Sequence, residues 1–132
     1  MGKREERETL LRALYSVDIL DDYESDSVRL FAGRNKWDQA TVDKILGIVA
    51  HLDLIDSYIS NHLRNWTISR IAIIDKSILR LAIYELVYEV TIPMKVIINE
   101  AVEIAKKYGT RDSFMFINGV LDAIAREIGR TT

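Results

Sequence analysis

The hydrophobic residues of this chain recur at helical spacing over almost its whole length, and this periodicity is the strongest limit on its fold. Apolar side chains follow the i, i+3, i+4, i+7 rule in one segment after another, interrupted mainly by one proline and six glycines. We therefore predict an all-α, single compact domain of about six or seven helices. The expected helices lie at about residues 4–20, 27–32, 42–63, 71–90, 93–109 and 113–128.

The segment 42–63 carries the most regular apolar stripe, so we expect it to form one unbroken helix of about six turns. The segment 71–90 is the most apolar, and we expect it to be central. Glu85 falls inside its apolar arc and must be paired, because an unpaired buried carboxylate is costly. Arg80 lies on the wrong face of the same helix to reach it. We therefore expect the partner of Glu85 to come from another helix.

Composition limits the classes of protein that remain. The chain has 132 residues, enough for one domain with its own core. It contains no cysteine, which excludes thiol catalysis and a disulfide framework. Its start is charged, and we find no run of about 20 apolar residues, so we expect a cytoplasmic protein without a membrane span. The formal net charge of −2 means that any nucleic-acid binding requires a local basic patch.

Catalytic and metal-binding patterns are nearly absent. His51 and His62 are 11 residues apart, about three helical turns, which is too far for them to share a metal ion. We find no glycine-rich phosphate loop and no nucleophile elbow. We expect no enzymatic activity, no metal and no cofactor.

The N-terminal helix carries a basic face with one aromatic ring, Tyr15. Cations can hold phosphates while a ring stacks on a base, so this pattern suits single-stranded RNA. Nearby glutamates dilute the patch, and when it is judged alone an ordinary solvated helix face is the more frequent explanation. The basic residues are Lys3, Arg4, Arg7 and Arg12, and the glutamates are Glu5, Glu6 and Glu8.

Two further features leave alternatives open. Phe116 projects almost opposite to Phe114 on the last helix, so either this helix packs on two sides or Phe116 is available to a ligand. Asn99 and Glu100 follow three β-branched residues near the start of their helix, and we expect both to have structural roles.

Five blocks of sequence together resemble the NusB family of bacterial transcription antitermination factors. Their order and spacing match over about residues 4–125. The blocks are RALY, the tryptophan followed by SR, DKSILRLAIYEL, IPMKVIINEAVEIAKKYG and SFMFINGVLD. The resemblance implies two small helical bundles, formed by about residues 1–65 and 66–132.

The resemblance also implies a function. Such proteins bind boxA, a short single-stranded RNA element of nascent ribosomal transcripts, together with the ribosomal protein NusE, and so act indirectly on the elongating RNA polymerase. Glutamates interrupt the family's arginine run here, in KREERE, so we expect the partner to supply further basic surface.

The residues that this interpretation assigns fall into two sets. The expected RNA-binding residues are Lys3, Arg4, Arg7, Arg12, Tyr15, Lys107, Arg111, Asp112, Ser113 and Phe116. The expected partner-binding residues are Asp75, which matches the family's carboxylate against NusE, with Lys76, Arg80 and Tyr84 on the same helix. A helical adaptor that binds only protein remains as the alternative. An RNA cytosine methyltransferase with a NusB-like domain is a third, which would require an additional cofactor-binding domain.

Overall fold

The fold is all-α, as predicted. In the computed structural model, residues 3–63, 68–110 and 112–132 are described, and these form seven α-helices and one short 3₁₀ helix. The helices are α1 (Lys3–Leu20), α2 (Ser25–Arg34), α3 (Gln39–Ala50), α4 (Leu52–Asn61), η1 (Ile68–Arg70), α5 (Ile73–Tyr88), α6 (Met94–Tyr108) and α7 (Ser113–Glu127). No helix in the described ranges is long and apolar enough to cross a membrane.

The prediction of one unbroken helix over residues 42–63 is wrong, because the backbone leaves the helical conformation at His51. The His51 N–H bonds the carbonyl of Ile48 at 3.1 Å, so α3 ends in a tightened turn before α4 begins. The apolar stripe itself continues, since Ile45 of α3 and Ile55 of α4 are both fully buried. Both residues therefore reach the core, although their helices point in different directions.

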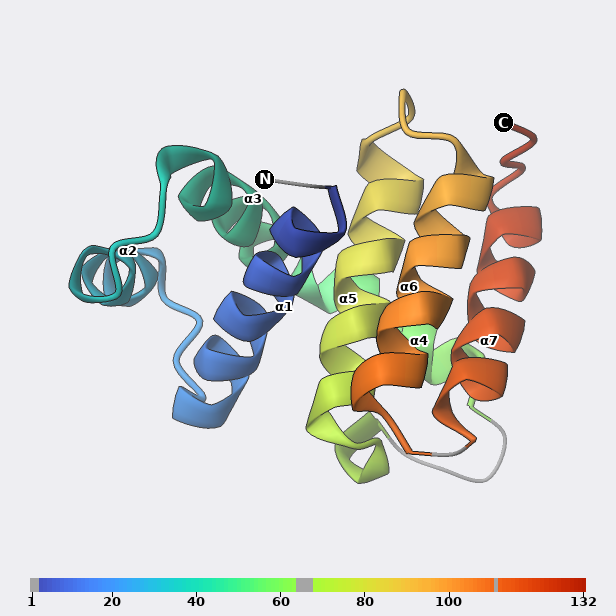
Figure 1. The fold of residues 1–132 in the computed structure, drawn as a ribbon, viewed down its shortest axis with the longest axis horizontal. Helices are drawn as coiled ribbons and strands as arrows, with labels where there is room; N and C mark the ends of the chain where they lie inside the picture. Colours follow the sequence, from blue (N-terminus) through green and yellow to red (C-terminus); the bar gives the residue numbers. More distant parts are fainter. Residues whose placement is uncertain (1–2, 64–67, 111) are drawn as a thin grey trace.

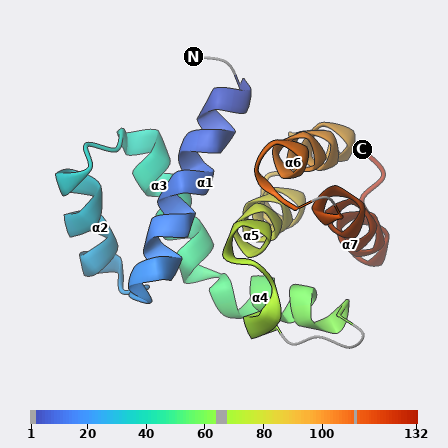
Figure 2. The same cartoon turned by 60° about the horizontal axis from the view of Figure 1, so that its bottom comes forward.

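The helices pack around α5. Helices α5, α6 and α7 run up, down and up side by side, and α1 lies antiparallel to α5 on its other flank (Figure 1). Helices α2 and α3 lie beyond α1, while α4 packs against α5 (Figure 2). The division into bundles at about residue 65 stays a prediction. The contact of α4 with α5 joins the first half of the chain directly to the second.

One continuous core joins all seven α-helices. The helix α5 contributes Leu79, Ile83 and Leu86, each 0% exposed. Burial of one such side chain contributes about 1.5–3 kcal/mol. The central position expected for this helix is therefore confirmed.

The expected partner of Glu85 does come from other helices. The Glu85 side chain is 1% exposed. Its carboxylate accepts hydrogen bonds from Arg7 of α1 and from Lys44 of α3, the latter at 2.8 Å. Lys44 also bonds Glu89 at 3.1 Å. Two cations and two carboxylates thus form a neutral cluster where α1, α3 and α5 meet.

Candidate nucleic-acid and partner interface

The first candidate site is a groove between α1 and the start of α5, which we call the Tyr15 groove. It has a volume of about 380 Å³. Arg12 and Tyr15 contribute to it from α1, and Tyr108 contributes from the end of α6. Tyr15 is 41% exposed and Tyr108 is 42% exposed. The remaining lining residues are Glu8, Leu11, Ser16 and Ile74. The groove therefore offers two accessible rings beside one cation.

The second candidate site, the Asp75 pocket, lies next to the Tyr15 groove. Ile74 and Tyr108 line the groove, and the pocket is lined by Asp75, which follows Ile74, and by Thr110, two residues after Tyr108. It has a volume of about 450 Å³. Its lining brings together four of the predicted site residues from the starts of α5 and α7. The lining residues are Leu63, Arg70, Ile71, Ala72, Asp75, Thr110, Asp112, Ser113 and Phe116.

Asp75 is the most unusual group of this pocket, because its carboxylate is buried and forms no ion pair with a described residue. Its Oδ2 accepts a hydrogen bond from the Ser113 hydroxyl at 3.0 Å, while Oδ1 has no partner within the described ranges. Burial raises the pKa of Asp75, and the Ser113 hydrogen bond opposes this shift only in part. Among the described residues, Asp75 therefore keeps one buried acceptor without a donor.

Hydrogen bonds at the start of α7 hold Ser113 beside Asp75. The Thr110 N–H donates to the Ser113 Oγ at 2.9 Å, at the start of α7. Gly109 makes this approach possible, since a Cβ there would lie 2.6 Å from the Ser113 Cβ and 2.7 Å from the Ala105 carbonyl oxygen. A glycine at this position therefore supports the shape of the pocket.

The two predicted basic residues of the first turns of α1 are engaged within the protein. Arg4 Nε donates to Glu100 Oε2 at 2.8 Å, and this hydrogen bond lowers the pKa of Glu100. The structural role expected for Glu100 is thus to tie α1 to α6. Arg7 is only 8% exposed and binds Glu85. The expectation that Arg7 lies on an accessible basic face is wrong, because α5 covers that side of α1.

The other predicted cations differ in their availability. Lys107 Nζ bonds Glu8 Oε1 at 2.8 Å, and the pKa of Lys107 is raised mainly by that hydrogen bond. Arg12 is exposed and makes no ion pair among the described residues. The side chain of Lys3 and the whole of Arg111 lie outside what the structure describes. Arg12 is therefore the most available of the described cations in the predicted set.

The predicted partner-binding cations are also largely occupied. Arg80 is 6% exposed and forms two bonds to Asp56, at 2.9 and 2.8 Å, and one to Asp18 at 3.3 Å. Lys76 bonds Asp18 at 3.0 Å. The expectation that Arg80 is accessible to a partner is wrong, because α1 and α4 pack over it and supply its carboxylate partners.

Tyr84 belongs to an aromatic cluster on the far end of α5. Its ring centroid lies 5.2 Å from that of Tyr88, which stacks on His51 at 4.3 Å. Gly47 leaves space for the Tyr84 ring, since a Cβ there would lie 2.4 Å from the hydroxyl oxygen. Tyr84 is therefore half-buried and distant along α5 from Asp75.

Tyr108 is not among the predicted site residues, because helical spacing places it on the same face as the buried Ile97 and Ile104. The residue occupies the last position of this helix, where the core no longer covers it. Its neighbour Lys107 lies 5.1 Å from the ring centroid. An aromatic residue at a helix end beside a cation could have indicated an accessible ring from the sequence.

The alternatives for Phe116 both hold in part. This ring packs partly on the core and also lines the Asp75 pocket.

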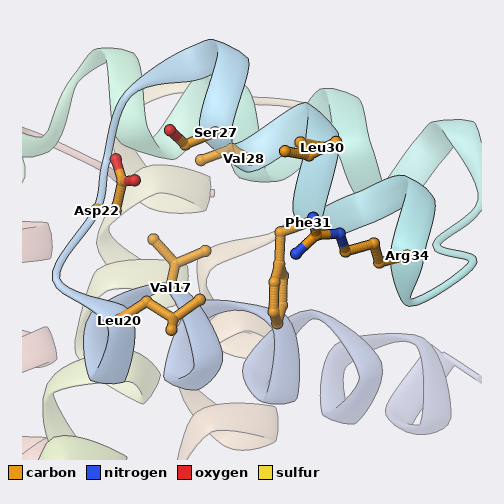
Figure 3. Close-up of a pocket in the computed structure, with 8 residues that line it drawn as sticks. All are labelled: Val17, Leu20, Asp22, Ser27, Val28, Leu30, Phe31 and Arg34. Carbon is orange, nitrogen blue, oxygen red and sulfur yellow. The ribbon is translucent and has the colours of Figure 1, made fainter.

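A third hollow, of about 230 Å³, lies between the end of α1 and α2 (Figure 3). Phe31 points from α2 toward α1, whereas Val17 points from α1 toward α2 and Leu20 lies below it along α1. Asp22 and Arg34 lie at its edges. None of its lining residues belongs to the sets predicted to bind RNA or a partner.

In the described part of the chain, no group of three or more metal-ligating side chains is close enough to hold a metal ion.

The helices packed around α5 form an all-helical binding domain. Its two adjoining hollows contain aromatic rings, a cation and a buried carboxylate. The sequence model of the NusB family matches residues 4–126. The transcription antitermination protein NusB of Bacillus velezensis is 40% identical over 128 residues, which cover 97% of this chain and 98% of the relative. NusB of Bacillus subtilis is 39% identical with the same coverage. The chain therefore belongs to the NusB family, and it is a transcription antitermination factor.

Solved structures agree with this assignment. A structure of T. maritima NusB matches with a TM-score of 0.80 and 34% identity, over 96% of this chain and 92% of that chain. A chain in the structure described as "Crystal Structure of a Plectonemic RNA Supercoil" matches with a TM-score of 0.79, over 98% of both chains. At 24% identity, the second match concerns the fold alone.

Proposed function

We propose that this protein binds boxA-type single-stranded RNA in nascent ribosomal transcripts, together with NusE, and acts in the cytoplasm on the elongating RNA polymerase through that complex. The observation that carries the proposal is the Tyr15 groove, where two accessible tyrosine rings lie beside the exposed Arg12. A base stacked on an aromatic side chain contributes about 1–3 kcal/mol, and a neighbouring cation holds the phosphate. This combination suits a single strand, whose bases are free to leave their own stack.

The RNA continues in this proposal from the Tyr15 groove to the Asp75 pocket. Phe116 offers a third ring there, and the exposed Asp112 offers carboxylate acceptors for base amino groups. Lys107 joins the phosphate contacts only when it exchanges Glu8 for the RNA, which limits its net contribution. With few phosphate contacts, log affinity should fall by roughly two to four units per unit of log salt concentration.

NusE is proposed to bind at the start of α5, where Asp75 lines the pocket and its Oδ1 has no partner among the described residues. Because Oδ1 is buried, a backbone N–H or a side-chain donor of the partner would pair with this carboxylate after the Asp75 side chain turns into the pocket, and that pairing would offset the cost of the unpaired oxygen. Because the Asp75 pocket adjoins the Tyr15 groove, a partner bound there would also extend the surface available to RNA. This arrangement accounts for cooperation between RNA and partner without a change of fold.

The test is fluorescence anisotropy of a labelled boxA RNA titrated with the protein, with and without NusE, at several salt concentrations. Tyr15→Ala removes a stacking ring, and Arg12→Met removes a phosphate contact. Arg29→Met removes an exposed charge of the same kind from α2, far from both hollows, and serves as the matched control. We expect the first two variants to weaken binding and the third to leave it unchanged. Equal affinities for all four proteins would contradict the RNA site.

One observation favours a second candidate function, a helical adaptor that binds protein without RNA. Arg4, Arg7 and Lys107 are all paired with carboxylates, so the free positive charge near the Tyr15 groove is small. Under this alternative, NusE binds with the same affinity whether or not RNA is present. Calorimetric titration of NusE into the protein, with and without the RNA, separates the two functions.

A further inference from the structure

Arg7 occupies a place where a phosphate cannot easily reach it. Its guanidinium side chain is 10% exposed, and its partner Glu85 is 1% exposed. The second carboxylate oxygen of Glu85 is held by Lys44 of α3. To bind RNA, Arg7 would have to leave a buried carboxylate with one cation instead of two, which is unfavourable in a poorly solvated site.

A second charged cluster holds the other end of α1. Asp18 accepts from Lys76 at 3.0 Å and from Arg80 at 3.3 Å, both on α5. Arg7 and Asp18 are eleven residues apart, which corresponds to about 16 Å along an α-helix. Since α1 and α5 are antiparallel, the two clusters fasten α1 to α5 near opposite ends of their contact (Figure 1).

Two of the predicted RNA-contacting side chains of α1, Arg12 and Tyr15, lie between these two attachments. Arg12 and Tyr15 face Ile74 of α5 and Tyr108 of α6 across the Tyr15 groove. The separation of the two tyrosine rings therefore depends on where α1 lies against α5. A change in either charged cluster should change the width of the groove without removing any group that touches RNA.

We propose that Arg7 is a positioning residue and not an RNA ligand: with Glu85 it holds α1 in the position in which Tyr15 and Arg12 face Tyr108. The inference rests on the proposed function for its consequence in RNA binding, although the positioning itself is a property of the free protein. It reassigns one arginine of the family's basic N-terminal segment from phosphate binding to the assembly of the groove.

The test compares Arg7→Met/Glu85→Leu, which replaces both charges of the pair with apolar side chains, with Arg7→Met alone and with Arg12→Met. Replacing both members of a buried ion pair leaves no unpaired charge, and Lys44 keeps Glu89. We expect the double variant to unfold at the wild-type urea midpoint and to bind boxA RNA with unchanged affinity and salt slope. Arg12→Met should weaken binding and lower the slope by about one unit. Arg7→Met alone should weaken binding while the slope stays unchanged.

The opposite result identifies a phosphate ligand. A double variant with the wild-type urea midpoint that binds RNA more weakly, with a slope lower by about one unit, would overturn the proposal. Rescue of both RNA affinity and urea midpoint in the double variant supports it, because a lost phosphate contact cannot be restored by an apolar pair.

A distance measurement keeps this test independent of RNA binding. The chain contains no cysteine, so Glu6→Cys and Lys106→Cys introduce the only two sites for spin labels, one on α1 and one on α6. We expect a narrow distance distribution in the parent protein and in the double variant, and a broad or shifted distribution in Arg7→Met. If the parent protein binds no RNA, the proposed function fails, and an unchanged distance in Arg7→Met would then also refute the positioning role.

Discussion

Replacement of Arg80 with methionine tests whether this residue is part of the core structure or of a partner surface. The substitution keeps an unbranched, partly apolar side chain of similar length but removes every hydrogen-bond donor. The lost bonds are two to Asp56, at 2.9 and 2.8 Å, and one each to Asp18 and to the Tyr23 hydroxyl, both at 3.3 Å. Three helices, α1, α4 and α5, would lose their common cation.

The size of the effect follows from the burial of the carboxylates left behind. Removal of one partner from a buried ion pair costs about 3–5 kcal/mol. The Asp56 side chain is 26% exposed and Asp18 keeps Lys76, so we expect the lower end, about 3 kcal/mol. At roughly 2.1 cal/mol/K per residue, a chain of this length has an unfolding entropy of about 280 cal/mol/K, which converts this loss to a decrease in Tm of about 11 °C.

Urea unfolding and a calorimetric melt measure this prediction, with Arg29→Met as the control for charge removal at an exposed helix position. The control should change the free energy of unfolding by no more than about 0.5 kcal/mol. Arg80→Lys should also destabilise the protein, because an ammonium group cannot make the two parallel bonds to Asp56. If Arg80→Met is as stable as the wild type but loses affinity for NusE, Arg80 is a partner contact and the structural reasoning is refuted.

Three further substitutions test the core, the loop before α7 and the buried acid. Leu79→Ala should lower the free energy of unfolding in urea by about 2–5 kcal/mol, since Leu79 is 0% exposed; a loss below about 1 kcal/mol would contradict its central position. Gly109→Ala should cost about 1–3 kcal/mol in the same assay through the overlap of the new Cβ with Ser113, and an unchanged stability would show that the loop yields freely. Burial raises the pKa of Asp75, so the wild type should lose stability as the pH rises from about 4 through the folded pKa toward about 7, whereas Asp75→Asn should not. The urea midpoint of Asp75→Asn, relative to the wild type, should therefore increase over this pH range, and a decrease would refute the assignment.

Helical periodicity in the sequence predicted the fold class because it depends mainly on local spacing. The buried apolar positions of α5 follow from this spacing, and so does the need of Glu85 for a partner from another helix. The break at His51 could not be read in the same way. The apolar stripe runs through it unchanged, and the bend is favoured by the packing of α4 on α5, which lies outside the local pattern.

The sequence named residues of the candidate site but did not predict how they lie relative to one another. Arg12 and Tyr15 are exposed on one groove, and Asp75, Asp112, Ser113 and Phe116 line one pocket, although they come from segments far apart in the chain. Tyr108 was assigned to the core because the stripe of α6 passes through it, but the helix ends there and the ring is exposed.

The sequence by itself determined the all-helical fold class, the apolar stripes and the family, because each of these depends on residue order and spacing. Only the tertiary structure decided which charges remain free. A helical pattern indicates the side of a helix on which a side chain lies. Whether a charged side chain there is buried and paired or exposed depends on which other segments pack against that side. Carboxylates from distant segments pair with the buried Arg7 and Arg80, while Arg12, on the same helix as Arg7, is exposed and stays available.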